Sequence, residues 1–292
     1  MHSVRDESRT FETIVLRDHD HASRVDVVPV RGGIVTRFEV DGRDVLFLDE
    51  STLVDPSKNI RGGIPVLFPI AGRLADDVWK RGERSIAMKQ HGFARNATWL
   101  EVGRASDQDA RVTLALGSSA STREAFPWEF EFRLTYVLKG ASLALEAEFE
   151  NRSEETMPLH AGFHPYFRVP DALKSRATIS TDATRAFDNT SGRTEAFAGF
   201  DLERSEVDLH LLDHHARTTR LHVAGEPATR IDMDSSFTTL VVWTLAGKDY
   251  VCVEPWTAPG NAMNTGTGLL HVAPGATRRA RFAITVERPA AL

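Results

Sequence analysis

The amino-acid sequence predicts an all-β fold, because apolar and polar residues alternate with a period of two in its most regular segments. In residues 129–138, Phe130 and every second residue after it are apolar, and the residues between them are mostly polar. The alternation resumes in residues 143–149, after the turn residues Lys139 and Gly140. Two such segments around a glycine turn indicate an antiparallel hairpin that has one buried and one solvated face.

The remaining elements, taken in chain order, are also mostly strands. Patterns of buried or half-buried strands occur at residues 13–16, 24–30, 34–40, 45–48, 111–116, 218–223, 238–245, 251–256 and 280–286. Helical patterns are limited to single turns at residues 121–125 and 259–264. Residues 182–217 are the least regular and most charged part, so we expect a long surface excursion there, and such excursions often carry binding groups. Many short strands without a Pro-, Gly- or Ser-rich linker favour one sandwich or barrel domain over residues 1–292.

Composition excludes several classes of function. The chain has 292 residues, of which 41% are hydrophobic and 26% charged, as is usual for globular proteins. A formal net charge of −6 without a basic block argues against binding to nucleic acid or to an anionic membrane. No apolar stretch approaches the roughly 18 residues of a membrane span, and the polar N-terminal segment lacks a signal-peptide core. We therefore expect a cytoplasmic protein.

Residues 251–256 form an apolar run that carries one carboxylate, Glu254, in its middle. The run lies between Lys248-Asp249 and a proline, and it predicts a buried strand. A carboxylate in such a strand must be paired, or desolvation must raise its pKa. Glu254 is therefore a candidate general base, whereas Cys252 in the same run is expected to be an inert buried thiol.

Histidines in a second segment are candidates for acid–base chemistry. His164 lies among aromatic residues and precedes a proline, which favours extended backbone and a desolvated imidazole with a lowered pKa. A core histidine that is hydrogen-bonded to backbone explains this pattern equally well. His160 is expected to be structural or to support a site residue without touching the ligand. His214 and His215 lie in a charged segment where we expect exposure to solvent.

Two glycine-rich loops carry further polar residues. His91 and Arg95 flank Gly92, which favours a turn and a close backbone approach. Arg61 opens another glycine-rich loop, and two arginines beside such turns can clamp an anion such as phosphate. A surface loop whose charges face water is the alternative interpretation.

Four short segments together resemble the aldose 1-epimerase (mutarotase) superfamily, particularly the branch related to hexose-6-phosphate mutarotases. They are Arg61-Gly-Gly-Ile-Pro-Val-Leu-Phe-Pro69, Gln90-His-Gly-Phe-Ala-Arg95, His164-Pro-Tyr-Phe167 and Val253-Glu-Pro255. Each segment is short, but their order and spacing match over most of the chain. The resemblance implies a galactose-mutarotase-like β supersandwich.

The resemblance also implies roles for individual residues. It implies that Glu254 removes the proton of the anomeric hydroxyl, that His164 protonates the ring oxygen, and that His91 orients and polarises the sugar. Asp208 resembles the family's carboxylate that holds sugar hydroxyls.

The segments leave the substrate open between a hexose and a hexose 6-phosphate. Arg61, Gln90 and Arg95 match residues that hold the substrate in the hexose-phosphate branch. By contrast, the dipeptide His164-Pro165 and residues 256–264 are more similar to branches that act on free aldoses.

Anomer exchange opens and recloses a hemiacetal without redox change, so we expect neither a cofactor nor a metal. The expected ligand is a small-molecule sugar or sugar phosphate, and the chain is expected to be a monomer or a homodimer. Two other classes stay open from the residues alone. One is a metal-dependent, cupin-like enzyme that binds zinc or iron through His91, His160, His164 and Glu254. The other is a non-catalytic carbohydrate-binding module.

Overall fold

The computed structural model describes residues 1–287, which form β-sheets with a few short helices. A five-stranded antiparallel sheet, called sheet I here, contains the first strands in chain order. Its members are β1 (His2–Ser8), β2 (Glu12–Asp18), β3 (Ser23–Val28), β4 (Ile34–Val40) and β5 (Arg43–Asp44).

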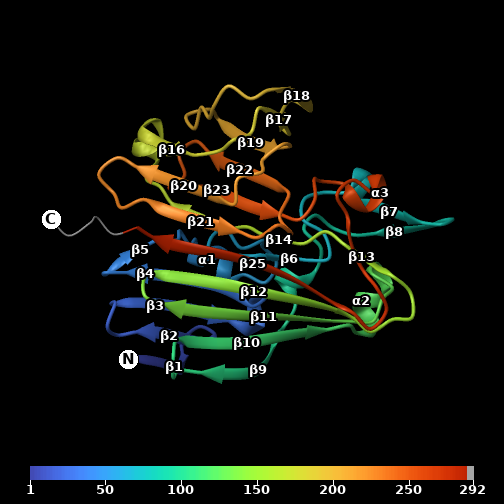
Figure 1. Cartoon of the computed structure of the whole chain (residues 1–292), viewed down its shortest axis with the longest axis horizontal. Coiled ribbons are helices and arrows are strands. Elements are labelled where there is room, and N and C mark those ends of the chain that lie inside the picture. Colours follow the sequence, from blue (N-terminus) through green and yellow to red (C-terminus); the bar gives the residue numbers. More distant parts are fainter. Residues whose placement is uncertain (288–292) are drawn as a thin grey trace.

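Sheet II has eight strands and lies in front of sheet I in the lower half of Figure 1. Strands β10 and β11 of sheet II pack against β1, β2 and β3 of sheet I. From one edge to the other, sheet II consists of β16 (Ala177–Ile179), β20 (Thr218–Val223), β21 (Thr229–Met233), β25 (Thr277–Val286), β12 (Ser142–Asn151), β11 (Phe130–Lys139), β10 (Ala110–Gly117) and β9 (Leu100–Ala105).

Sheet III lies mostly in the upper half of Figure 1, beside the first strands of sheet II, and it contributes strands to the candidate site. Isolated bridges connect segments in or next to sheets I and III: Val35 of β4 pairs with Ile64, and Leu46, which follows β5, pairs with Phe167. The strands of sheet III, in order, are β18 (Arg193–Ala196), β17 (Arg185–Asp188), β19 (Glu206–Leu211), β22 (Thr239–Leu245), β23 (Tyr250–Trp256), β14 (Gly162–Phe163) and β6 (Val66–Leu67), with β15 (Tyr166–Arg168) also paired to β23.

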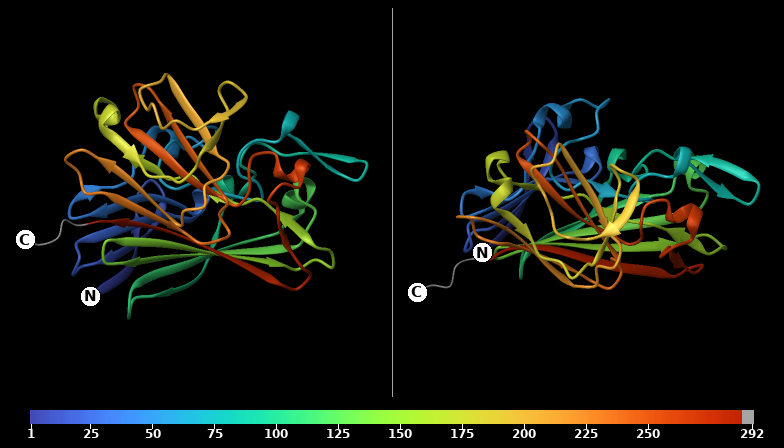
Figure 2. Two further views of the ribbon diagram at one scale, coloured as in Figure 1. Left: turned by 45° about the horizontal axis from the view of Figure 1, so that its top comes forward. Right: turned by 90° about the horizontal axis from the view of Figure 1, so that it is seen from above.

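The remaining elements are small and lie around the sheets, as the two further views in Figure 2 show. Two strand pairs stand apart, namely β7 (Val78–Arg81) with β8 (Arg84–Ala87), and β13 (Met157–Leu159) with β24 (Leu270–Val272). The α-helices are α1 (Glu50–Val54), α2 (Ala120–Ala125) and α3 (Ala262–Thr265), and short 3-10 helices occur at Pro29–Arg31, Ala75–Asp77, Ala94–Asn96 and Asp171–Arg176. None of the helices in residues 1–287 is long and apolar enough to cross a membrane.

The predicted all-β class is confirmed, and so is the hairpin, since β11 and β12 pair antiparallel through Lys139 and Ser142. The prediction for residues 182–217 is wrong, because this segment contains the three strands β17, β18 and β19 of sheet III. Its charged residues suggested a surface loop, yet β19 pairs along its whole length with β22 in the sheet. The predicted strand at 45–48 is replaced by β5 and by isolated bridges at Leu46 and Leu48.

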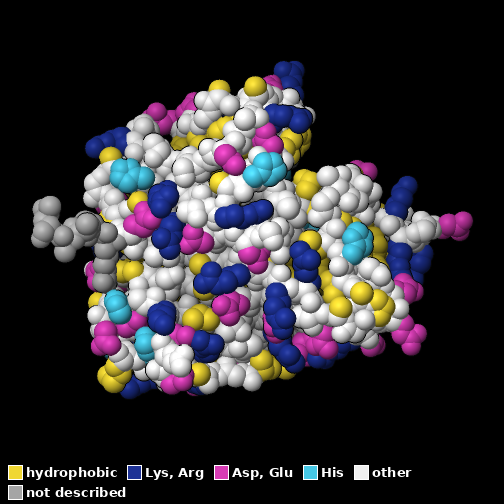
Figure 3. Space-filling view, viewed as in Figure 1, with side chains coloured by type: hydrophobic (Ala, Val, Ile, Leu, Met, Phe, Trp, Pro, Cys, Tyr) yellow, Lys and Arg dark blue, Asp and Glu magenta, His cyan; other side chains and the backbone are white. Residues whose placement is uncertain are grey.

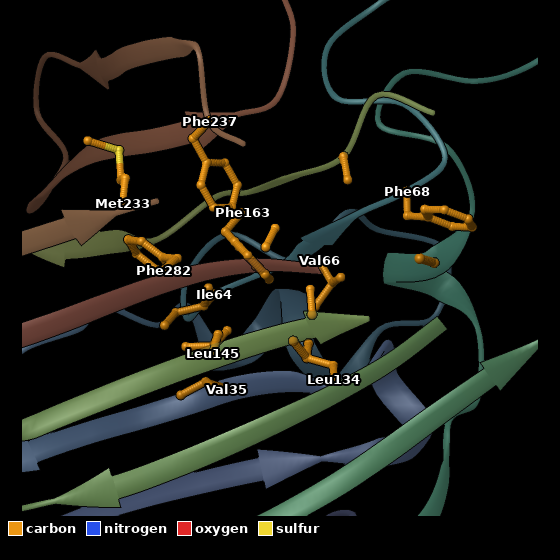
Figure 4. Close-up of a cluster of buried hydrophobic side chains, with 14 of the residues drawn as sticks. Val35, Ile64, Val66, Phe68, Leu134, Leu145, Phe163, Met233, Phe237 and Phe282 are labelled. Carbon is orange, nitrogen blue, oxygen red and sulfur yellow. The ribbon is translucent and has the colours of Figure 1, made fainter. Parts of the chain in front are cut away.

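Alternation along the strands explains where the core lies. In β11 and β12 the apolar residues face the interior, and the charged residues between them face solvent. Figure 4 shows how side chains from different sheets meet, and Phe163 of β14 stacks on Phe282 of β25 with ring centroids 5.5 Å apart. Phe68, which follows β6, packs among five further phenylalanines that include Phe149 at 5.7 Å. The core therefore joins the strand that carries the site to the broad sheet below it.

The outer face of sheet II carries acidic and basic side chains that pair with each other across neighbouring strands. Glu148 lies opposite Arg279 in the register of β12 and β25, and their side chains form an ion pair at 2.7 Å. Glu146 and Arg281 form the next pair at 3.5 Å. Acidic and basic side chains are accordingly interspersed on the face shown in Figure 3.

Strand β9 forms one edge of sheet II and is irregular. Its register with β10 shifts between Thr113 and Leu114, so that Gly103 and Glu101 take consecutive partners and Val102 is left as a bulge. Leu100 and Val102 are exposed. Arg104 of the same strand binds both carboxylate oxygens of Asp6 in β1, at 3.0 and 3.1 Å.

Candidate active site

A cavity of about 820 Å³ opens beside sheet III. All seven residues singled out from the sequence line it, namely Arg61, Gln90, His91, Arg95, His164, Asp208 and Glu254. They come from loops before β6 and after β8, from the turn between β14 and β15, and from strands β19 and β23. The fold thus brings together segments that are up to 193 residues apart in the sequence, from Arg61 to Glu254.

Glu254 lies in β23, in which every residue is buried, as the apolar run predicts. The strand is paired on one side with β22 and on the other with β14 and β15. Burial raises the pKa of the Glu254 carboxyl well above its ordinary value, and the negative charge of Asp208 adds to this shift. The indole N–H of Trp256 opposes it by donating a hydrogen bond to Oε2 of Glu254, at 3.1 Å.

His164 lies in the turn that joins β14 to β15. Its ring stacks on that of Tyr166, with centroids 4.7 Å apart and an interplanar angle of 8°. Trp243 meets it edge-on at 5.9 Å, so the imidazole is enclosed by aromatic rings. Burial lowers the pKa of His164 below its ordinary value, and the positive charges of Arg95 and Arg61 lower it further.

The two groups are direct neighbours, since Nε2 of His164 lies 3.3 Å from Oε1 of Glu254. Burial favours the neutral form of each, and the neutral pair differs from the ion pair only by the position of one proton between these atoms. A buried carboxyl and a buried imidazole at this distance can act as an acid and a base in turn.

His91 has left-handed backbone, with φ of 67°, and is buried. Its Nδ1 accepts a hydrogen bond from the N–H of Gly72 at 2.9 Å, and its own N–H donates to the Gly72 carbonyl at 2.8 Å. Burial, followed by the charges of His164 and Arg95, lowers the pKa of His91 well below its usual range. Because Nδ1 is an acceptor in this neutral ring, the proton resides on Nε2, and His91 is a hydrogen-bond donor.

Gly92 follows His91 and allows the close backbone approach that the sequence predicted for this loop. Its φ is +67°, and a Cβ atom there would lie 2.3 Å from the carbonyl oxygen of Phe68. Phe93 and Ala94 both donate their backbone N–H groups to that same oxygen, at 3.0 and 3.1 Å. Glycine at this position therefore lets the loop of His91 dock on the chain that follows β6.

Arg61 and Arg95 place two guanidinium groups at the cavity. Arg61 lies over the ring of Trp243, 5.1 Å from its centroid. Arg95 donates from Nη2 to the Gln90 carbonyl at 3.0 Å, while its Nε is buried without a partner within the described residues. Burial and the nearby charge of Arg61 both lower the pKa of Arg95, although an arginine stays protonated at neutral pH. Neither guanidinium forms an ion pair with a carboxylate in residues 1–287.

Asp208 lies in β19 beside His210, a histidine that was not predicted from the sequence. Its Oδ2 accepts from Nδ2 of Asn189 at 2.7 Å, and its Oδ1 lies 3.2 Å from Nε2 of His210. His210 is buried, lines the cavity, and meets Trp256 edge-on at 5.0 Å. Period-two alternation in residues 206–211 puts Asp208 and His210 on one face, and this signal could have identified His210.

Two other histidines, His160 and His214, are buried and lie outside the cavity lining. His160 is fully buried outside the cavity lining, where burial lowers its pKa to about 3. His214 was predicted to be exposed, and that prediction is wrong, since it is 5% exposed and its Nδ1 lies 2.9 Å from the Thr181 hydroxyl. The charged residues around His214 in the sequence turn to solvent while its own ring packs inward.

Three buried side chains offer ligand atoms within 4.8 Å of one another, namely His164, Cys252 and Glu254. A thiol, an imidazole and a carboxylate are together suited to Zn²⁺. This group includes neither His91 nor His160, which the metal hypothesis from the sequence had required. Arg61 and Arg95 also face His164, and their positive charges oppose a dication at the same place.

Comparisons with known proteins identify relatives of this chain and of its fold. The Slr1438 protein from Synechocystis sp. PCC 6803 is 36% identical, its structure aligns with a TM-score of 0.92, and the match covers 98% of this chain and 100% of that one. A galactose mutarotase-like protein from Clostridium acetobutylicum shares the fold, with a TM-score of 0.81 at 20% identity over 98% and 99% of the two chains. A protein of Cenchrus ciliaris, provisionally named glucose-6-phosphate 1-epimerase, is 29% identical over 80% of this chain and 67% of its own length.

A protein-family sequence model matches nearly the whole chain. The sequence model of the family described as aldose 1-epimerase matches residues 12–285. This range contains the strands of sheets II and III, apart from the last residue of β25, and all seven site residues predicted from the sequence. The fold is the galactose mutarotase-like β-sandwich that the four sequence segments implied. This chain belongs to the aldose 1-epimerase family and is an isomerase of that type.

Proposed function

We propose that the chain interconverts the α and β anomers of a hexose 6-phosphate by general acid–base catalysis. The observation that carries the choice of substrate is the pair of guanidinium groups, Arg61 and Arg95, which line the cavity without a carboxylate partner in residues 1–287. Two such cations in a partly desolvated site are suited to a phosphate dianion. The provisional name of the Cenchrus ciliaris relative supports the same choice.

Ring opening requires a base at the anomeric hydroxyl and an acid at the ring oxygen. Both oxygens are bonded to C1, so the two protein groups must lie close to each other. Glu254 and His164 meet this condition at 3.3 Å. The proposed step starts from the ion-pair form, which arises when the proton of Glu254 moves to His164. Glu254 then takes the O1 proton while His164 gives its proton to the ring oxygen, and the C1–O5 bond breaks to give the open-chain aldehyde.

Reclosure uses the same groups with their roles exchanged. After rotation about the C1–C2 bond, neutral His164 takes back the proton of the C5 hydroxyl as its oxygen attacks C1. Protonated Glu254 returns a proton to the carbonyl oxygen, which becomes O1 of the other anomer. No electron is lost or gained and the pair ends in its starting state, so the reaction as written needs no cofactor.

The other polar groups orient the sugar. Nε2–H of His91 is suited to donate a hydrogen bond to a ring or anomeric oxygen, since its tautomer is fixed by Gly72. The Asp208 side chain lines the cavity and is 18% exposed, so its carboxylate is suited to accept hydrogen bonds from hydroxyl groups of a bound sugar. Gln90 is exposed at the cavity, where it adds an amide to the side of the two arginines.

The test compares anomer exchange, measured by two-dimensional exchange NMR, for glucose 6-phosphate, glucose and galactose. Arg61→Gln and Arg95→Gln should each raise KM for glucose 6-phosphate about 10- to 100-fold, which is the effect of one hydrogen bond to a charged group. The same variants should leave exchange of free glucose nearly unchanged. Arg73→Gln is the matched control, because Arg73 lies at the cavity rim, is 70% exposed in its side chain, and pairs with Asp77.

Three results would count against the proposal in different ways. Faster exchange of free glucose than of glucose 6-phosphate would show that the preferred substrate is not phosphorylated. Equal losses for both sugars in the arginine variants would show that these residues do not bind phosphate. Sugar binding without any anomer exchange would make the chain a carbohydrate-binding module and would refute the catalytic assignment.

A further inference from the structure

Trp256 occupies an unusual position next to the carboxylate that the proposed function uses as a base. It is two residues after Glu254 in β23, so both side chains point to the same face of the strand. Its Nε1–H donates to Oε2 of Glu254 at 3.1 Å, while the other oxygen, Oε1, faces His164. The two carboxylate oxygens therefore have different environments.

Two glycines from distant segments hold the indole in place. A Cβ atom on Gly162, which lies opposite Trp256 in the β14–β23 pairing, would come within 2.7 Å of Cδ1. A Cβ atom on Gly72 would lie 2.7 Å from Cζ3 at the other end of the ring system. Any larger residue at either position would push on the ring, so the two glycines leave the space that the indole occupies.

The indole also meets three imidazoles edge-on. The ring centroids of His210, His160 and His91 lie 5.0, 5.8 and 5.9 Å from it. Trp256 is itself 3% exposed, so this contact helps to exclude water from the back of the cavity. Packing of this kind fixes the donor nitrogen relative to the carboxylate.

We propose that Trp256 is the positioning residue of the catalytic base: its N–H holds Oε2 of Glu254, so that Oε1 is the oxygen that exchanges protons with the substrate. This inference rests on the proposed function, since it names Glu254 as the base. A hydrogen bond to the ionised carboxylate also favours that form over the protonated one. Trp256 thus counteracts burial and the charge of Asp208, which both favour the protonated form.

Other titratable groups surround Glu254 and must stay the same in a test. They are His164 and Tyr166 from the β14–β15 segment, Asp208 from β19, and Cys252 from β23 itself, with Arg61, Arg95 and His91 beyond them. A Trp256→Phe substitution changes none of these groups. It keeps an aromatic ring in the same space and removes the N–H donor.

The first measurement follows the carboxyl band of Glu254 by infrared difference spectroscopy as pH is varied, with Glu254→Gln used to assign the band. In Trp256→Phe the pKa of Glu254 should rise by about one to two pH units, the effect of one hydrogen bond to a charged group. This experiment needs no turnover, so it can fail or succeed independently of the proposed function. An unchanged pKa would overturn the inference.

The second measurement is the pH profile of anomer exchange. In Trp256→Phe the acidic limb of kcat/KM should move to higher pH by the same amount, with kcat lowered and KM unchanged. Trp79→Phe is the matched control, since it removes a buried indole N–H that donates to the Ala125 carbonyl at 3.1 Å, away from the cavity. Its profile should coincide with that of the wild type.

A second variant covers the case in which Trp256→Phe does not fold. Gly162 does not have a positive φ, so alanine can adopt its backbone conformation. A Cβ there would lie 2.7 Å from Cδ1, the atom bonded to the donor nitrogen, and 3.0 Å from the Pro255 carbonyl oxygen, so the indole must move. Gly162→Ala should raise the pKa of Glu254 in the same direction. A rise in neither variant, or a defect confined to KM, would assign Trp256 to packing and refute a positioning role.

Discussion

Replacement of Glu254 by Gln should lower the catalytic rate and, as pH rises, make the protein more stable than the wild type. The variant therefore separates the role of Glu254 in catalysis from its effect on stability. Glutamine has nearly the same shape, and its amide oxygen can take the place of Oε2 and accept the hydrogen bond from Trp256. It cannot take a proton from a sugar hydroxyl. A positioned general base contributes about 10²–10⁴-fold, so kcat for anomer exchange should fall by that factor, which corresponds to a barrier increase of about 3–5 kcal/mol.

Stability should change in the other direction as pH rises. Burial raises the pKa of Glu254 in the folded state above its ordinary value of 4.5. Between these two pKa values the folded chain retains a proton that the unfolded chain has lost, so the wild type loses stability as pH increases. Its unfolding constant should grow by up to about tenfold per pH unit relative to that of Glu254→Gln, which has no such group.

Urea unfolding, followed by tryptophan fluorescence at pH values roughly one unit apart from 5 to 8, measures the difference in unfolding free energy between the wild type and Glu254→Gln. Anomer exchange of the same preparations gives the loss of activity. Wild-type exchange in Glu254→Gln would refute the role of Glu254 as a base. A stability difference that shrinks with rising pH would refute the statement that burial raises its pKa.

Two further variants test the site and the core. His91→Asn suits the left-handed backbone at this position but removes the Nε2–H donor, so kcat/KM should fall about 10- to 100-fold without loss of fold, and a wild-type value would exclude a polarising role. Phe149→Ala should lower the free energy of unfolding by about 3–5 kcal/mol in urea titrations, because Phe149 is 2% exposed and packs on Phe132 at 4.5 Å. A loss below 1 kcal/mol, on the order of a surface substitution, would show that this layer of the core is not tightly packed.

The strands that could be predicted are those in which one face is buried and the other solvated. In β11 and β12 the alternation of apolar and charged residues is regular, and the structure has the expected hairpin. The segment 182–217 was misread because charge there was taken as a sign of a loop. In β19 the polar residues Asp208 and His210 face the cavity, so they occur in a strand for a reason that composition alone does not reveal.

The site could be predicted in part for a similar reason. An isolated Glu254 in an apolar run indicates a buried carboxylate from local sequence alone, and the structure has it buried. The hydrogen bond from Trp256 could not be predicted, because its geometry depends on Gly72 and Gly162, which lie far away in the sequence. The inward packing of His214 likewise depends on a partner, Thr181, that is 33 residues earlier.

The irregular register of β9 has a consequence for how the molecule behaves at high concentration. A free strand edge with two solvent-facing apolar side chains, Leu100 and Val102, is a template on which a strand from a second molecule could assemble. The extra residue at Val102 interrupts the row of backbone donors and acceptors, and the tie between Arg104 and Asp6 draws the strand toward its own N-terminal neighbour. We therefore expect the β9 edge of this eight-stranded sheet to resist pairing with a strand of a second molecule.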